Sequence, residues 1–81
     1  MTAKIRLITG ENCHLCDQAK AILNPLLEAR KMRLIELSVG DDKVLFERYG
    51  LRIPVVIFPD GSEKGWPFTS AQISRMLDRL V

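Results

Sequence analysis

The chain begins with a short alternating run of apolar and polar residues and continues with apolar residues at helical spacing. Residues Lys4–Thr9 alternate, contain β-branched side chains and stop at Gly10, a pattern that predicts a first strand. Asn12 or its neighbour is expected to cap the helix that follows, and Pro25 predicts a kink or a break in it near Asn24. One face of this helix is expected to pack on a sheet through residues that recur every three or four positions: Leu15, Ala19, Ile22 and Leu26.

The middle of the chain alternates again and then becomes continuously apolar. Residues Arg33–Val39 alternate between apolar and polar side chains, which is typical of a half-exposed edge strand. Asp41 and Asp42 supply a cap for a short helix that is expected to stop at Gly50. Residues Val55–Phe58 are all apolar, so they predict a central strand covered on both faces.

The last third of the chain predicts a hairpin followed by a helix. Pro59–Gly61 is a turn sequence, after which Ser62–Gly65 can return as a short strand. Thr69–Gln72 fits a capping box, with Phe68 and Ile73 placed as a hydrophobic staple. The helix that follows has an apolar stripe of Ile73, Met76, Leu77 and Leu80. The resulting order, β-α-β-α-β-β-α, predicts an α/β fold with a mixed sheet flanked by helices.

The composition is that of an ordinary globular protein, and we expect a single domain over residues 1–81. Hydrophobic residues make up 47% of the chain and charged residues 27%. The net charge is only +2 and the basic residues are scattered, which argues against a nucleic-acid partner. No apolar run approaches the roughly 20 residues of a membrane span, and no signal-peptide pattern precedes the first strand. We therefore expect a cytoplasmic monomer without a membrane partner.

Cys13 and Cys16 are the only cysteines, and they form a Cys-x-x-Cys pair where the first strand gives way to the helix. Two residues three positions apart lie on one face of a first helical turn and can close a small disulfide ring. Because so short a ring removes little entropy from the unfolded chain, the pair fits a redox role better than a structural one. The helix N-terminus favours a thiolate on the first cysteine, which makes Cys13 the candidate nucleophile.

Three segments together resemble the thioredoxin superfamily over essentially the whole chain. They are Cys13–Asp17, Tyr49–Val55 and Trp66–Phe68, and with the chain length they look most like the small bacterial glutaredoxin-like proteins. The resemblance implies a thioredoxin-like fold, in which a four-stranded mixed sheet is flanked by three helices. It also implies a thiol–disulfide oxidoreductase that acts in electron transport through a redox-active disulfide.

The resemblance assigns roles to the two cysteines and to the segment before the third strand. Cys13 would attack a target disulfide, and Cys16 would resolve the resulting mixed disulfide. Pro54 is expected to be cis and to lie against the cysteine pair, while the backbone of Ile53 is expected to dock an extended substrate. Further substrate-binding residues are expected nearby: His14, Leu15, Arg52 and Trp66.

Most of the glutathione-binding signature of glutaredoxins is altered in this chain. The lysine that commonly precedes the first cysteine is absent, Leu15 replaces an aromatic residue, and Arg52 stands where the family has threonine. Arg52 and the helix start at Thr69 are nevertheless candidate partners for a carboxylate. The expected partners are a disulfide-containing protein or a low-molecular-weight thiol. Glutathione is a candidate co-substrate, and glutathione or a thioredoxin reductase-type protein is the expected electron donor, with no bound cofactor or metal.

Several of these features also have a plainer interpretation. On a helix the His14 side chain points about 100° away from that of Cys13, which suits an exposed residue that only tunes the pair. Trp66 and Phe68 are residue types that more often fill a core or its rim than form a substrate platform. The alternative function is a non-catalytic thioredoxin-fold module that binds a metal, an iron–sulfur cluster or a protein partner. Zinc normally takes four ligands, so such a site would have to be shared between chains.

Overall fold

The computed structural model describes residues 3–80. Both ends of the expected domain, residues 1–81, therefore lie outside the described residues. The predicted order of strands and helices is confirmed. No helix in the described part of the chain is long and apolar enough to cross a membrane. The elements are β1 (Lys4–Thr9), α1 (His14–Ala29), β2 (Arg33–Ser38), the 3-10 turn η1 (Val39–Asp41), α2 (Lys43–Tyr49), β3 (Val55–Ile57), β4 (Glu63–Gly65) and α3 (Ser70–Asp78).

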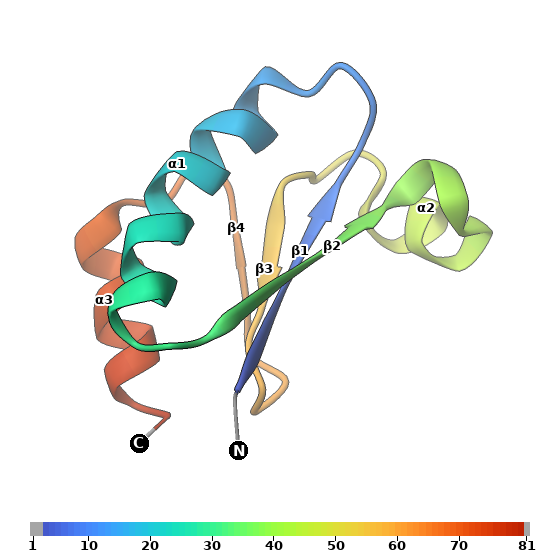
Figure 1. Ribbon diagram of the computed structural model, residues 1–81. Helices are drawn as coiled ribbons and strands as arrows, with labels where there is room; N and C mark the ends of the chain where they lie inside the picture. Colours follow the sequence, from blue (N-terminus) through green and yellow to red (C-terminus); the bar gives the residue numbers. More distant parts are fainter. Residues whose placement is uncertain (1–2, 81) are drawn as a thin grey trace.

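The four strands form one mixed sheet in the order β2-β1-β3-β4. β1 pairs with β2 in parallel and with β3 antiparallel, so that Leu7 lies opposite Glu36 on one side and Val56 on the other. β3 and β4 form the predicted hairpin, in which Ile57 lies opposite Glu63. β2 occupies an edge of the sheet and β3 an inner position, as their sequences predict. Helices α1 and α3 cover one face of this sheet, and α2 lies on the other (Figure 1).

Successive residues of β1 supply two separate cores. Leu7 points to the face covered by α1 and α3, while Ile8 points to the face covered by α2, because neighbouring side chains of a strand alternate. The larger core contains Ile5, Leu7, Ala19, Leu23, Leu27, Val56, Phe58, Phe68, Ile73 and Leu77. The smaller core contains Ile8, Val39, Tyr49 and Val55. The sheet is therefore fixed to helices on both faces near the carboxyl end of β1.

The buried stripe of α1 differs from the predicted one. Its buried residues are Cys16, Ala19, Leu23 and Leu27, whereas Ile22 and Leu26 lie beside the stripe and are partly buried. The expectation that Leu15 shares the buried face is wrong, since 43% of Leu15 is exposed. The buried stripe is shifted by about one residue from the predicted one, which places Cys16 at its N-terminal end.

Helix α1 runs from His14 to Ala29 without the break expected near Asn24. A proline inside a helix costs about 3 kcal/mol or more, because it removes a hydrogen bond and crowds the preceding turn. Leu23 and Leu27 lie on either side of Pro25 and are almost fully buried. Burial of a leucine contributes about 1.5–3 kcal/mol, so together the two leucines match that cost.

One element boundary agrees with the sequence prediction, and another departs from it. The cap of α1 is Cys13, the neighbour of Asn12, and Asn12 itself adopts a positive φ of 53°, a conformation that asparagine tolerates. β2 ends at Ser38, and Val39 begins η1 instead of closing the strand. Val39 therefore belongs to the connection between β2 and α2.

An arginine joins the two helices on the larger core. Arg30, at the end of α1, donates to Ser74 Oγ at 2.8 Å and to Asp78 Oδ1 at 3.1 Å on α3. It also donates to the carbonyl oxygen of Leu26 at 3.1 Å, which satisfies one of the free carbonyl groups at the end of α1. The helices are thus held together by polar contacts at one end and by apolar packing along their length.

The capping box predicted at the start of α3 is present. Thr69 Oγ1 accepts from the backbone N–H of Gln72 at 3.1 Å, and Gln72 Oε1 accepts from the backbone N–H of Thr69 at 2.9 Å. We predict that Thr69→Ala lowers the free energy of unfolding by about 1 kcal/mol, the typical cost of losing a helix cap. Urea unfolding would measure it, and Thr69→Ser serves as the control that keeps the hydroxyl. An equal loss in both variants would contradict this role.

Candidate active site

The two cysteines form a disulfide at the N-terminus of α1. Cys13 is the N-cap and Cys16 lies in the first turn, with their Cα atoms 5.2 Å apart. The backbone N–H of Cys16 donates to Cys13 Sγ at 3.1 Å. Cys13 is half-buried, whereas only 3% of Cys16 is exposed. The fold therefore presents one sulfur toward solvent and keeps the other beneath it.

This asymmetry gives the two sulfur atoms different chemistry in the reduced protein. Free N–H groups and the positive end of the helix dipole favour negative charge on Cys13 Sγ. Cys16 belongs to the buried stripe of α1, so an external disulfide has little access to it. In the reduced protein this arrangement leaves Cys13 as the accessible sulfur and Cys16 as the protected one.

The segment before β3 approaches the loop that carries the cysteines. The Ile53–Pro54 peptide bond is cis, as the resemblance implies, and Pro54 is fully buried. The Ile53 side chain lies over Gly10, where a Cβ atom would come within 2.6 Å of Ile53 Cδ1. A residue with a side chain at position 10 would therefore push Ile53 away from the loop between β1 and α1.

The backbone of the same segment is only partly used inside the protein. The backbone N–H of Trp66 donates to the Pro54 carbonyl oxygen at 3.1 Å, which joins the end of β4 to this segment. Within residues 3–80, neither backbone group of Ile53 makes a backbone–backbone hydrogen bond. Ile53 is half-buried and lies outside any strand.

A polar cluster that the sequence does not reveal surrounds Arg52. The Tyr49 hydroxyl donates to Glu63 Oε2 at 3.1 Å, and Glu63 Oε1 lies 3.7 Å from Arg52 Nη2. The Arg52 guanidinium lies 5.3 Å from the centre of the Tyr49 ring. Tyr49 is 3% exposed, so a buried side chain fixes the position of the carboxylate. Arg52, a candidate partner for a substrate carboxylate, thus has a carboxylate of this chain beside it.

The remaining predicted site residues fall into two groups. His14 and Leu15 lie on the exposed side of the first turn of α1, next to Cys13. Trp66 is partly buried at the rim of the larger core and makes an edge-to-face contact with Phe68, with ring centres 5.0 Å apart. Trp66 and Arg52 also line one hollow of about 440 Å³. The rim interpretation of Trp66 is thus confirmed, while its part in substrate binding stays a prediction.

Comparison with protein families identifies the chain. The family model described as glutaredoxin-like domain (DUF836) matches residues 4–78, which is nearly the whole chain. The chain belongs to this family.

Solved structures agree with that assignment. Target protein XcR50 from X. campestris is 36% identical to this glutaredoxin-like protein, and its crystal structure has a TM-score of 0.81 with 93% of this chain and 96% of that chain covered. Its solution structure has a TM-score of 0.80, with 96% and 95% covered. Thioredoxin 1 from Thermosipho africanus TCF52B is 13% identical, with a TM-score of 0.76 and 95% and 92% covered, and shows the shared fold alone.

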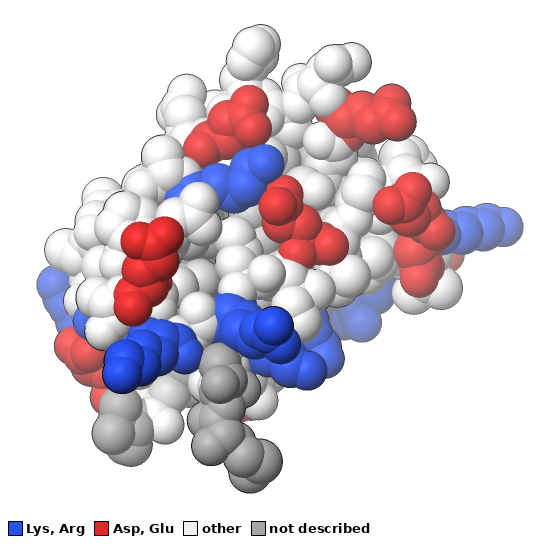
Figure 2. Space-filling view, in the orientation of Figure 1, with Lys and Arg blue, Asp and Glu red and all other residues white. Residues whose placement is uncertain are grey.

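In this glutaredoxin-like protein, an ion pair joins α1, the helix that carries the cysteines, to the edge strand β2. Lys20 Nζ on α1 lies 3.1 Å from Glu36 Oε1 on β2 and 3.5 Å from Asp17 Oδ1. The hydrogen bond and the negative charge of Glu36 raise the pKa of Lys20, so its ammonium group stays charged. Charges of both signs are interspersed over this side of the molecule, and Lys and Arg gather near the start of β1 (Figure 2).

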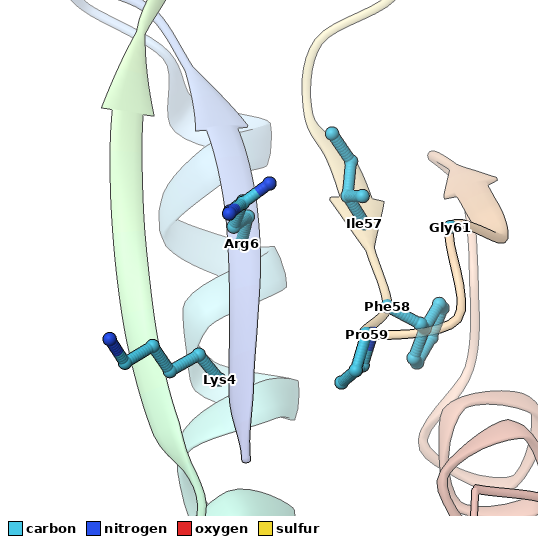
Figure 3. A pocket seen from close by; sticks show the side chains of 6 residues that line it. All are labelled: Lys4, Arg6, Ile57, Phe58, Pro59 and Gly61. Carbon is cyan, nitrogen blue, oxygen red and sulfur yellow. The ribbon is translucent and has the colours of Figure 1, made fainter.

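A second hollow lies away from the cysteines. It has a volume of about 370 Å³ and is lined by Lys4 and Arg6 of β1 together with Ile57, Phe58, Pro59 and Gly61 (Figure 3). Because Lys4 and Arg6 are at the start of β1 and the cysteines follow its end, this hollow is not part of the disulfide site. Within the described residues, no three His, Cys, Asp or Glu side chains are grouped so as to hold a metal ion.

The unequal exposure of the cysteines predicts unequal reactivity. We expect a limiting amount of iodoacetamide at neutral pH to alkylate Cys13 of the reduced protein at least about tenfold faster than Cys16, because only Cys13 is both accessible and next to the helix N-terminus. Peptide mass spectrometry after brief labelling would measure the ratio. Protein unfolded in urea is the control, in which the difference should largely disappear. Equal labelling of the folded protein would contradict the assignment.

Proposed function

We propose that this glutaredoxin-like protein is a thiol–disulfide oxidoreductase, with Cys13 as the nucleophile and Cys16 as the resolving thiol. The observation that carries the proposal is the position of the pair: an accessible sulfur at a helix N-terminus, linked to a second sulfur buried one turn below it. Membership of the glutaredoxin-like family supports the same chemistry.

The exchange transfers two electrons from the dithiol to the substrate disulfide. The Cys13 thiolate attacks one sulfur of the substrate, which forms a mixed disulfide and releases the other substrate sulfur as a thiolate that takes up a proton. Cys16 then loses its proton and attacks Cys13 Sγ. The mixed disulfide breaks, the second substrate thiol is released, and the Cys13–Cys16 disulfide forms. Cα atoms 5.2 Å apart are within the ordinary range for a disulfide, so this step requires no large backbone movement.

Ile53 is the proposed docking point for the substrate backbone. Its N–H and carbonyl groups can pair with an extended segment in the manner of an added strand. The contact of its side chain with Gly10 links this docking point to the loop that carries the cysteines. His14 and Leu15 on the exposed first turn, and Arg52 and Trp66 beside the docking segment, complete the proposed substrate surface.

The proposed substrate is a disulfide in a polypeptide or in a low-molecular-weight compound. A second exchange in the reverse direction returns the pair to the dithiol, at the expense of two electrons from a thiol donor. Glutathione and a thioredoxin reductase-type protein are the two donor classes that this chemistry accepts. The exchange itself requires no cofactor bound to this chain, because the two cysteines carry the electrons.

Removal of the resolving thiol tests the proposal directly. We predict that Cys16→Ser, mixed in reduced form with a model peptide disulfide, accumulates a mixed disulfide between Cys13 and the peptide, because nothing remains to break it. Intact mass spectrometry and peptide mapping would detect the adduct. Cys13→Ser is the matched control and should form no comparable adduct, since Cys16 is buried.

Two results would contradict the proposal. An adduct that forms equally in both variants would show that Cys13 has no special role. Absence of any adduct in Cys16→Ser, with the protein folded and its Cys13 thiol free, would favour the non-catalytic binding module.

A further inference from the structure

The hollow beside the docking segment combines apolar side chains with one pair of opposite charges. It measures about 440 Å³ and is lined by Leu51, Arg52, Val55, Glu63, Gly65 and Trp66. Arg52 and Val55 flank Ile53 and Pro54 directly in the chain, so this hollow adjoins the proposed docking point. Leu51 is fully exposed and Trp66 is partly buried, which leaves apolar surface available for contact.

The charges of the two ionisable residues that line this hollow balance each other. Arg52 contributes one positive charge to the lining and Glu63 one negative charge, with 3.7 Å between Nη2 and Oε1. Glu63 is held on the other side by the hydroxyl of the buried Tyr49. Arg48 also lies over the Tyr49 ring, at 5.5 Å, but it lines a neighbouring hollow that contains Glu47. The carboxylate of Glu63 is thus positioned by a rigid partner rather than free to move away.

We propose that this hollow is a subsite without net charge, which accepts an uncharged substrate side chain beside the target cysteine. Glu63 is the specificity-determining residue, because its carboxylate balances the charge of Arg52. The proposal rests on the exchange function above and narrows its substrates. A substrate carboxylate that approaches Arg52 must compete with Glu63 and is repelled by it. An apolar side chain meets no such opposition and covers Leu51 and Trp66.

The substrate class that follows is a polypeptide disulfide with an uncharged, apolar residue next to the reacting cysteine. Glutathione is disfavoured in this subsite, because its carboxylates outnumber its ammonium group. Arg52 alone would attract such an anion, which is why the pairing with Glu63 decides the preference. The altered glutathione signature of the sequence is consistent with this selection.

Replacement of Glu63 by its amide tests the proposal with little structural change. In Glu63→Gln the side-chain oxygen can still accept from the Tyr49 hydroxyl, while the negative charge is lost. The substrates are a peptide disulfide with leucine beside the target cysteine, the matched peptide with glutamate, and glutathione disulfide. We expect the rate ratio of the glutamate peptide to the leucine peptide to rise about three- to fivefold in Glu63→Gln, the size of an exposed ion-pair effect. The rate of glutathione disulfide relative to that of the leucine peptide should rise by a similar factor.

Controls separate this effect from a general change of charge. Glu28→Gln, at the far end of α1, removes one carboxylate outside the hollow and should leave the ratios at the wild-type value. The increase in Glu63→Gln should also shrink at about 0.5 M salt, because exposed charges are screened there. Thermal unfolding would establish that both variants are folded.

The possible failures are distinguishable. Unchanged ratios in Glu63→Gln, or an equal rise in Glu28→Gln, would overturn the proposed subsite while leaving the exchange function in place. If wild-type protein reacted with none of the three disulfides, and Cys16→Ser trapped no adduct, the exchange function itself would fail and the subsite with it.

Discussion

The packing of α1 on the sheet decides which cysteine meets the solvent. Ala19, Leu23 and Leu27 fill the larger core, and Cys16 continues their stripe by one turn toward the N-terminus of the helix. Because Cys13 is three residues earlier, it becomes the cap of the helix and stays accessible. The ion pair of Lys20 with Glu36 holds the same helix against the edge strand. The exposure of one cysteine and the burial of the other are thus consequences of core packing.

The two faces of the sheet have different tasks at the site. One face carries α1 and therefore the cysteines, while the other carries α2, whose last residue, Tyr49, orients Glu63 of β4. The segment from Arg52 to Pro54 connects α2 with β3 and passes between these two structures. The proposed docking point at Ile53 and the charged contact at Arg52 both lie in this segment. The cysteines and the proposed docking point are thus positioned by separate parts of the fold.

The periodicity of hydrophobic residues and the turn residues together predict nearly all of the strands and helices. Residues such as Gly10 and Gly50 mark clearly where a strand or a helix ends. The spacing of the cysteines predicts the disulfide between them for the same local reason. The exposure of Leu15 could not be predicted, since it depends on how α1 is rotated on the sheet. The contact of Glu63 with Arg52 depends on the register of the β3–β4 hairpin, and nothing in the sequence signals the cis bond between Trp66 and Pro67.

A redox titration of the cysteine pair tests the central claim most directly. The protein would be equilibrated in buffers of defined glutathione ratio, quenched with acid, alkylated and weighed by mass spectrometry. A working exchanger should pass between dithiol and Cys13–Cys16 disulfide in one two-electron transition, at roughly −200 to −270 mV if it acts as a reductant. A disulfide that resists reduction throughout this range would instead indicate a structural bridge and would contradict the account.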